Sequence, residues 1–328
     1  MTLDEIRALV GADMAAVDSV IRSRLKSAVP LVDQVAEHII AGGGKRLRPL
    51  IVLLSAHAAS AGAPAGRGQY LEAAAFIEFI HTATLLHDDV VDHSSRRRGR
   101  DTANAVFGNE ASVLVGDFVY SRAFQMMAAT GSQRVMEIMA DATNVIAEGE
   151  VLQLMNAHDA DTTEDRYLEV IYRKTARLFE AGAQVAAVLC GSGTAAENAL
   201  ARYGRHLGAA YQLIDDVFDY RSDPATRGKN LGEDLAEGKP TLPLIHALRH
   251  SVGRDAEEIR RAIRHDDGTV ADMTAIINCI DRTGGIDYTR ERAQAESALA
   301  IAAVMELPAS PCREGLAALA RVAVERDR

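Results

Sequence analysis

The chain has 328 residues, of which 48% are apolar and 25% are charged, a balance typical of a globular protein with a substantial core. The formal net charge of −10 argues against a nucleic-acid surface or an anionic membrane surface, because both attract clustered Lys and Arg. Nowhere do about 18 uncharged apolar residues run together, and the first residues lack a secretory pattern. We therefore expect a cytoplasmic protein without stable membrane insertion.

The three cysteines, Cys190, Cys279 and Cys312, are far apart and have no metal-ligand spacing. An odd number of isolated cysteines favours free thiols in a reducing compartment. We expect no disulfide framework and no structural zinc.

The expected elements are all helical. Apolar residues recur at spacings of three and four along almost the whole chain, and strand-like alternation is missing. Breaks between helices are expected at residues 42–44, 61–68, 94–108 and 222–232. None of them is a long low-complexity linker, so we predict a single domain over residues 1–328.

Three helix starts can be located from their capping residues. Thr162 and Thr163 precede the acidic pair Glu164 and Asp165, the segment from Thr194 to Glu197 has the capping-box pattern, and Ser310 precedes a proline.

Two acidic motifs stand at the ends of apolar segments: HDDVVD at residues 87–92 and IDDVFD at 214–219. Positions i and i+4 share one face of a helix, so Asp88 should project beside Asp92, and Asp215 beside Asp219. A single motif of this kind could be a solvated acidic helix end. Two copies behind apolar segments favour carboxylates that line a shared cavity.

Carboxylates gathered at a cavity raise one another's pKa unless cations lie between them. Mg²⁺ suits such a site, since it uses one or two carboxylates and completes its shell with water and phosphate oxygens, whereas the loops that favour Ca²⁺ are missing. The motifs therefore indicate a phosphorylated ligand.

Cationic segments agree with a phosphorylated ligand. They are GGGKRLRP at residues 42–49, RRRG at 96–99, and the lysines Lys174, Lys229 and Lys239. The glycine segment lacks the spacing of a nucleotide-binding loop, and taken alone it could equally be a helix cap with surface cations.

Many ordered motifs together resemble the trans-type polyprenyl diphosphate synthases, closest to the octaprenyl diphosphate synthases among the long-chain members. They are GGGKRLRP, FIEFIHTATLLHDDVVD, RRRG, VLVGDF, AEGEVLQL, KTARLFE, YQLIDDVFDY and GKNLGEDLAEGKPTLPL. The resemblance implies an all-α isoprenoid synthase fold, a large antiparallel helical bundle around a central elongated cavity. It also implies a homodimer that adds isopentenyl diphosphate head-to-tail to an allylic diphosphate.

The resemblance also assigns roles to individual residues. The metal ligands would be Asp88, Asp89, Asp92, Asp215, Asp216 and Asp219. Contacts to the allylic diphosphate would come from Arg97, Lys174 and Lys229, with Lys239 as a further substrate-binding residue. The isopentenyl diphosphate pocket would be formed by Lys45, Arg48, His81 and Arg98, while Thr175 and Gln212 would face the developing carbocation. Arg96 is left as surface charge and His87 as a core residue.

Charge balance supports three Mg²⁺ ions. The six aspartates and a diphosphate carry about nine negative charges, which three Mg²⁺ and three of the cations would balance. Clamping of the diphosphate favours ionisation of the allylic C–O bond, after which isopentenyl diphosphate attacks and a proton leaves. This chemistry needs no side-chain nucleophile but does need dry apolar walls.

The resemblance implies that product length follows from side-chain size in the turns of the helix before the first acidic motif. Ala83 and Thr84 are small and would leave a tunnel open, and Met127 and Met139 on the next two helices would form its floor or simply fill the core. We predict an octaprenyl product made from farnesyl diphosphate for a quinone side chain, with nonaprenyl and decaprenyl products as alternatives.

Three other readings explain less of the sequence. A class I terpene cyclase normally carries a different second metal motif and lacks the GGGKRLRP pocket. A non-catalytic subunit of a heteromeric synthase should have lost acidic residues that are all present here, and a plain metal-binding bundle does not account for the cationic segments.

Overall fold

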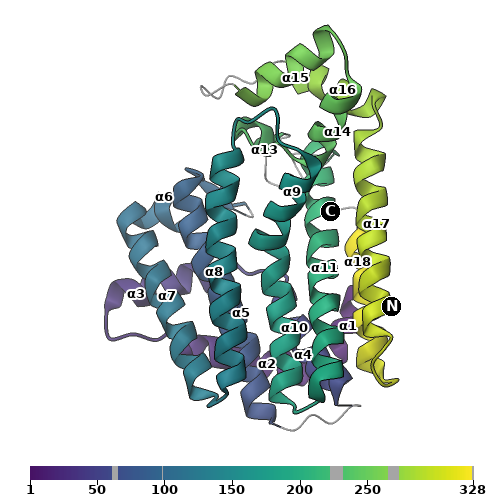
Figure 1. Cartoon of the computed structure of the whole chain (residues 1–328). Helices are drawn as coiled ribbons and strands as arrows, with labels where there is room; N and C mark the ends of the chain where they lie inside the picture. The colour runs from purple at the N-terminus through teal and green to yellow at the C-terminus, as the bar shows by residue number, and fades with distance from the viewer. Residues whose placement is uncertain (61–65, 98, 222–231, 265–272, 327–328) are drawn as a thin grey trace. The chain divides into compact units, whose positions relative to one another are not determined.

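The computed structural model describes residues 1–60, 66–97, 99–221, 232–264 and 273–326 (Figure 1). Helices dominate it, which confirms the all-α prediction. The chain divides into two compact units. The first unit comprises Met1–Thr143, Leu178–Gly204 and Ile301–Leu319, and the second comprises Asn144–Arg177, Arg205–Ala300 and Ala320–Arg328. The assignment of residues 1–328 to a single domain stays a prediction.

The first unit begins with a series of helices joined by short connections. In chain order they are α1 (Leu3–Ala8), α2 (Gly11–Arg24), α3 (Pro30–Ala41), α4 (Leu47–Ala59), α5 (Arg67–Val91), α6 (Ala103–Phe107) and α7 (Asn109–Ala129). A short antiparallel ladder, which the sequence did not predict, lies between α5 and α6. It pairs β1 (Arg96–Arg97) with β2 (Arg100–Asp101).

The core of this unit surrounds α4 and α5. Leu50 to Leu54 on α4 are fully buried, as are Phe76, Ile77, Phe79 and Ile80 on α5. A helix that is apolar on several faces is stable only when other helices surround it, and α5 packs against α2, α4 and α7. The burial of α5 fixes the position of the first acidic motif at its C-terminal end.

His87 packs where α5 meets α7. A side chain at Gly116 on α7 would place its Cβ only 2.4 Å from Nε2 of His87, so this close approach requires glycine. The same nitrogen lies 3.3 Å from the carbonyl oxygen of Val113 and 3.3 Å from a carboxylate oxygen of Asp117. The His87 side chain is 35% exposed, so it packs at the edge of the α5–α7 contact and is not the core residue that the sequence predicted.

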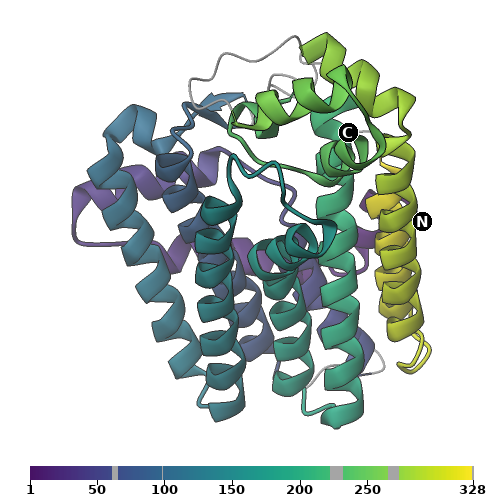
Figure 2. The same cartoon turned by 45° about the horizontal axis from the view of Figure 1, so that its top comes forward.

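The later helices carry the second acidic motif. They are α8 (Gln133–Asn156), α9 (Glu164–Ile171), α10 (Arg177–Leu189), α11 (Gly193–Arg221), α13 (Glu233–Ala236), α14 (Leu242–His250), α15 (Arg254–Arg264), α16 (Met273–Arg282), α17 (Gly285–Val304) and α18 (Pro311–Glu325). Between α9 and α10 the five residues Tyr172–Ala176 form a π-helical segment, η1. Within the second unit α14, α15 and α16 pack on one another in both views (Figure 1, Figure 2).

The predicted caps have mixed outcomes. Thr163 caps α9 by accepting a hydrogen bond from the backbone of Arg166, and Ser310 accepts one from Arg313 at the start of α18. The third helix, α11, begins at Gly193, one residue before the threonine that was predicted to cap it. Glu197 instead accepts hydrogen bonds from Arg134 and Gln184, so the predicted capping box is wrong here.

Candidate active site

The first unit contains a cavity beside the first acidic motif. Its lining comes from the end of α3, the 42–46 loop, one face of α5 and the residues around the ladder, and it includes His81, Asp89 and Arg97. The structure thus brings three of the predicted site residues together.

Asp89 is the buried member of the first motif. It is 5% exposed, whereas Asp88 and Asp92 are half-buried. The Arg97 guanidinium donates from Nε to Oδ1 of Asp89 at 2.9 Å, and its Nη2 lies 2.8 Å from the same oxygen. Burial raises the pKa of Asp89, the nearby charge of Arg97 lowers it, and the charges of Asp88 and Asp92 raise it further. The ionised form of Asp89 is therefore disfavoured in the folded protein, and a bound cation would stabilise it.

Arg46 is a cavity residue that the sequence analysis missed. Its backbone is left-handed, with φ of 45°, and its Nη1 lies 2.8 Å from Oε1 of the buried Glu78 on α5. Its neighbours Lys45 and Arg48 are not among the residues that line this cavity as described. The Lys45 carbonyl accepts a hydrogen bond from Arg7, and the Arg48 guanidinium stacks over the ring of Phe179 at 4.6 Å. Their role in substrate binding stays a prediction.

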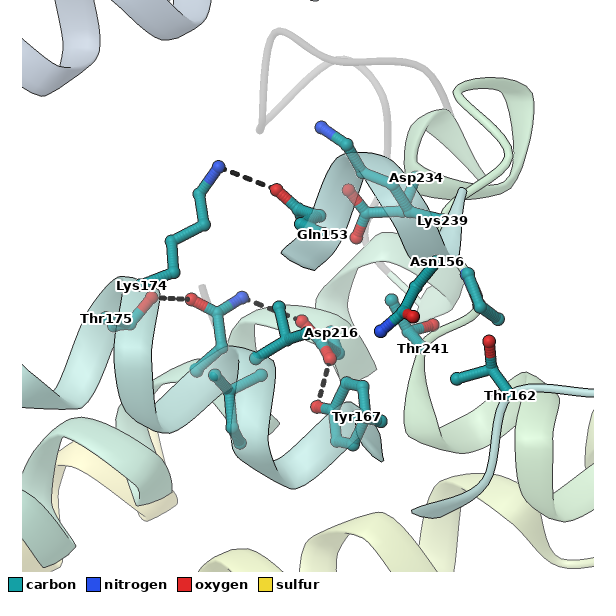
Figure 3. A pocket seen from close by; sticks show the side chains of 14 residues that line it. Gln153, Asn156, Thr162, Tyr167, Lys174, Thr175, Asp216, Asp234, Lys239 and Thr241 are labelled. Carbon is teal, nitrogen blue, oxygen red and sulfur yellow. Dashed lines mark hydrogen bonds between the residues drawn. The ribbon is translucent and has the colours of Figure 1, made fainter. Parts of the chain in front are cut away.

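The second unit contains the cavity shown in Figure 3. It is lined by the end of α8, α9, η1, α11 and the 239–241 segment. Five predicted residues meet there: Lys174, Thr175, Gln212, Asp216 and Lys239. Residues of the same lining that the sequence analysis missed include Tyr167, Gln153 and Asp234.

Asp216 is the centre of a hydrogen-bond chain in this cavity (Figure 3). It is 2% exposed and accepts hydrogen bonds from the Tyr167 hydroxyl and, at 2.8 Å, from the Gln212 amide nitrogen. The Thr175 hydroxyl in turn donates to the Gln212 amide oxygen at 3.0 Å. Burial raises the pKa of Asp216 well above its ordinary value, and the charge of Asp234 raises it further, against the lowering effect of both hydrogen bonds.

Lys174 lies at the rim of the cavity, between two side chains of α8. Its Nζ lies 2.5 Å from Oε2 of Glu150 and 2.7 Å from Oε1 of Gln153. Gly149 permits this contact, since a Cβ at that position would lie 2.7 Å from the Cβ of Arg173 and 2.8 Å from the backbone nitrogen of Lys174. The π-helical η1 thus places Lys174 and Thr175 side by side at the cavity.

Three further predicted residues of this unit, Lys239, Asp215 and Asp219, also have partners. Nζ of Lys239 lies 2.6 Å from Oε2 of Glu237, and Nη2 of Arg326 lies 2.7 Å from Oδ1 of Asp215. Buried Asp219 accepts a hydrogen bond from the backbone nitrogen of Asp234 at 3.2 Å. The buried members of this motif are therefore Asp216 and Asp219, which are three residues apart, and the prediction that Asp215 and Asp219 project from one face of the helix stays a prediction.

Several predicted residues fall outside these two cavities. Ala83, Met127 and Met139 are fully buried, and the hydroxyl of half-buried Thr84 donates to the backbone oxygen of His81. None of the four belongs to the lining of either cavity as described. Arg98 and Lys229 lie outside the described residues.

A divalent cation fits the chemistry of these carboxylates. Within the described ranges, no three His, Cys, Asp or Glu side chains already converge on a point that could hold an ion. Asp89 and Asp216, one buried aspartate from each motif, nevertheless have pKa values raised by burial and by neighbouring carboxylates. Acidic oxygens in such surroundings suit a hard cation whose shell is completed by water and phosphate oxygens.

No helix in the described part of the chain has the length and apolar character needed to span a bilayer.

The chain is similar to known proteins over its whole length. The polyprenyl synthetase family matches residues 29–280. The octaprenyl diphosphate synthase of Escherichia coli (strain K12) is 52% identical over 328 residues, covering 100% of both chains. Among solved structures, a polyprenyl synthase of Caulobacter crescentus CB15 in complex with calcium and isoprenyl diphosphate has a TM-score of 0.94 and 46% identity, covering 100% of this chain and 98% of that one. A decaprenyl diphosphate synthase of Rhodobacter capsulatus has a TM-score of 0.93 and 43% identity, covering 100% of both chains. The chain therefore belongs to the polyprenyl synthetase family and has the isoprenoid synthase fold.

Proposed function

We propose that this protein is a long-chain trans-polyprenyl diphosphate synthase that condenses isopentenyl diphosphate with an allylic diphosphate, and that its product is octaprenyl diphosphate. The observation that carries the proposal is the cavity of the second unit, where Lys174, Thr175, Gln212 and Asp216 meet as the sequence pattern predicts. Full-length similarity to an octaprenyl diphosphate synthase supports the product length.

Basic side chains at both cavities could bind a diphosphate in place of their present carboxylate partners. Arg97 pairs with Asp89, Lys174 with Glu150, and Lys239 with Glu237. Each pair holds a basic side chain at a cavity wall, and a diphosphate oxygen could replace the carboxylate as its partner. Replacement at Arg97 would also release an Asp89 oxygen for metal binding.

The six aspartates of the two motifs would hold the metal, which we propose to be three Mg²⁺ ions. When bound, Mg²⁺ would neutralise the diphosphate and make it a better leaving group. The solved relative from Caulobacter was crystallised with calcium and isoprenyl diphosphate, which supports a divalent cation beside a diphosphate.

The allylic carbon would lie beside Thr175 and Gln212. Their oxygens present lone pairs rather than hydrogens to a developing positive charge, and Val170 and Ile171 supply apolar wall that limits access of water. Electrostatic stabilisation by fixed dipoles is often the largest contribution to such a step.

The proposal also covers the allylic substrate, the oligomeric state, the cellular location and the use of the product. We propose farnesyl diphosphate as the primer, a homodimer as the assembly, the cytoplasm as the location and a quinone side chain as the use of the product. A decaprenyl product is the alternative that similarity to the Rhodobacter enzyme favours.

A direct assay tests the function. The purified protein is incubated with Mg²⁺, farnesyl diphosphate and labelled isopentenyl diphosphate, and the dephosphorylated products are sized by chromatography. We expect a dominant alcohol of eight isoprene units. A product of ten units would replace octaprenyl by decaprenyl, and absence of any elongated alcohol would overturn the enzyme assignment.

A further inference from the structure

Tyr167 is the first donor of the hydrogen-bond chain in the second cavity, at the end opposite Thr175 (Figure 3). It is 5% exposed and donates to Oδ2 of Asp216, whose Oδ1 accepts from the Gln212 amide. The chain ends at Thr175, which is half-buried and lines the cavity. Four side chains from α9, α11 and η1 are thus joined in one line, and only Tyr167 among them has no role in the proposed reaction so far.

The hydrogen-bond chain has a direction, because each of its groups is fixed either as a donor or as an acceptor. An amide nitrogen can only donate, so Asp216 fixes the Gln212 side chain with its nitrogen toward the carboxylate and its oxygen toward Thr175. A threonine hydroxyl has one hydrogen, and Thr175 uses it on that amide oxygen. The lone pairs of the Thr175 oxygen are therefore left for an electron-poor group in the cavity.

Tyr167 is what keeps Asp216 in the orientation that the chain requires. Among the described residues, each oxygen of this buried carboxylate accepts a hydrogen bond from one donor, which opposes rotation about the bond to Cβ. Loss of the phenol hydroxyl would leave one oxygen without this donor, so the carboxylate could turn and the Gln212 amide could flip. A flipped amide presents its nitrogen to Thr175, whose hydrogen would then be free to point into the cavity.

We infer that Tyr167 is a positioning residue that sets the direction of this chain, and through it the orientation of both Asp216 and Thr175. The inference rests on the proposed function, because it assigns the oriented oxygens to the metal and the allylic cation. In this inference Tyr167 acts through Asp216 and is not itself a metal ligand.

The first test compares two tyrosine variants. Tyr167→Phe removes only the hydroxyl, and Tyr203→Phe is the matched control, because Tyr203 is fully buried in the first unit and donates to the backbone oxygen of Leu316 at 2.9 Å. We expect Tyr167→Phe to lower kcat by about tenfold to a hundredfold, the range for residues that orient metal ligands, with the KM for isopentenyl diphosphate unchanged. Binding of Mn²⁺ in the presence of inorganic pyrophosphate, measured by calorimetry, should weaken several-fold, and Tyr203→Phe should match the wild type in both measurements.

The second test uses the other end of the chain. Thr175→Val removes a hydroxyl that is separated from Asp216 by two hydrogen bonds, so binding of Mn²⁺ and pyrophosphate should weaken several-fold only if the chain acts as one unit. This variant decides the question if Tyr167→Phe does not fold. Wild-type Mn²⁺ binding in Thr175→Val, or a folded Tyr167→Phe with kcat and Mn²⁺ binding like Tyr203→Phe, would overturn the inference. Failure of the proposed function is recognised separately, because the wild-type protein would then elongate no primer.

Discussion

Lys174 and Glu150 form an ion pair at the second cavity, with Nζ 2.5 Å from Oε2, and the neighbouring Arg173 forms a parallel pair with Glu148 at 2.5 Å. Lys174 lines the cavity, whereas Arg173 and Glu148 are outside its lining as described. Two adjacent ion pairs on the same two elements therefore differ in whether they lie at the proposed diphosphate site.

Glu150→Gln should strengthen binding of inorganic pyrophosphate. The substitution removes a carboxylate that competes with the diphosphate for Lys174. A partly exposed pair worth about 1 kcal/mol corresponds to about a fivefold change in affinity. Glu148→Gln is the control and should leave the affinity unchanged. Weaker pyrophosphate binding in Glu150→Gln, measured by calorimetry, would mean that Glu150 supports Lys174 and does not compete for it.

Asp88→Asn should lower turnover by roughly a hundredfold or more while the protein stays folded, because a neutral amide is a poor ligand for Mg²⁺. Asp215→Asn should behave in the same way and should also lose its ion pair with Arg326. Asp117→Asn is the control, since that exposed carboxylate contacts His87 outside the cavity lining as described. Turnover and circular dichroism are measured for all three variants, and near-normal turnover in the first two would contradict the metal roles.

From the sequence we predicted the helices and many of the site residues. The contacts between side chains that are far apart in the sequence could not be predicted in this way. Caps located the starts of α9 and α18 because their signals are local, and the two acidic motifs lie at the C-terminal ends of α5 and α11 as expected. Tyr167 and Arg46 could not be found in this way. Their roles depend on contacts with Asp216, 49 residues away, and with Glu78, 32 residues away. The π-helical turn of η1 was missed as well, since it has no pattern of its own.

The burial of the aspartates in the second motif also could not be predicted from the sequence. Helical spacing places Asp215 and Asp219 on one face, yet Asp216 and Asp219 are the buried members and Asp215 is paired with Arg326 near the C-terminus. Which carboxylate is buried depends on the neighbouring helices, and spacing along one helix does not contain that information.

Asp216→Asn should stabilise the metal-free protein at neutral pH. The pKa of this buried carboxyl is raised above the ordinary 3.8 in the folded state, so its contribution to stability is fully present below pH 3.8 and is lost as pH rises through the folded-state value. The melting temperature of the wild type in EDTA should therefore fall from acidic toward neutral pH relative to that of Asp216→Asn. Added Mg²⁺ with pyrophosphate should raise the wild-type melting temperature but not that of the variant. A variant that is less stable than the wild type at pH 7 would contradict this prediction.

Enlarging Ala83 should shorten the product. Ala83 is fully buried on α5, five residues before Asp88, and a larger side chain would narrow the path proposed for the growing chain. Overpacking of a buried position costs about 1 to 3 kcal/mol, so a graded series of Val, Leu and Phe separates blocking of the path from loss of the fold. Product length after dephosphorylation should decrease with side-chain volume, while thermal unfolding reports the stability of each variant. The control is Ala317→Val, because Ala317 is also fully buried but lies on α18, which carries none of the predicted chain-length residues, and its product should keep the wild-type length. Unchanged product length in a folded Ala83→Phe protein would show that Ala83 does not face the growing chain.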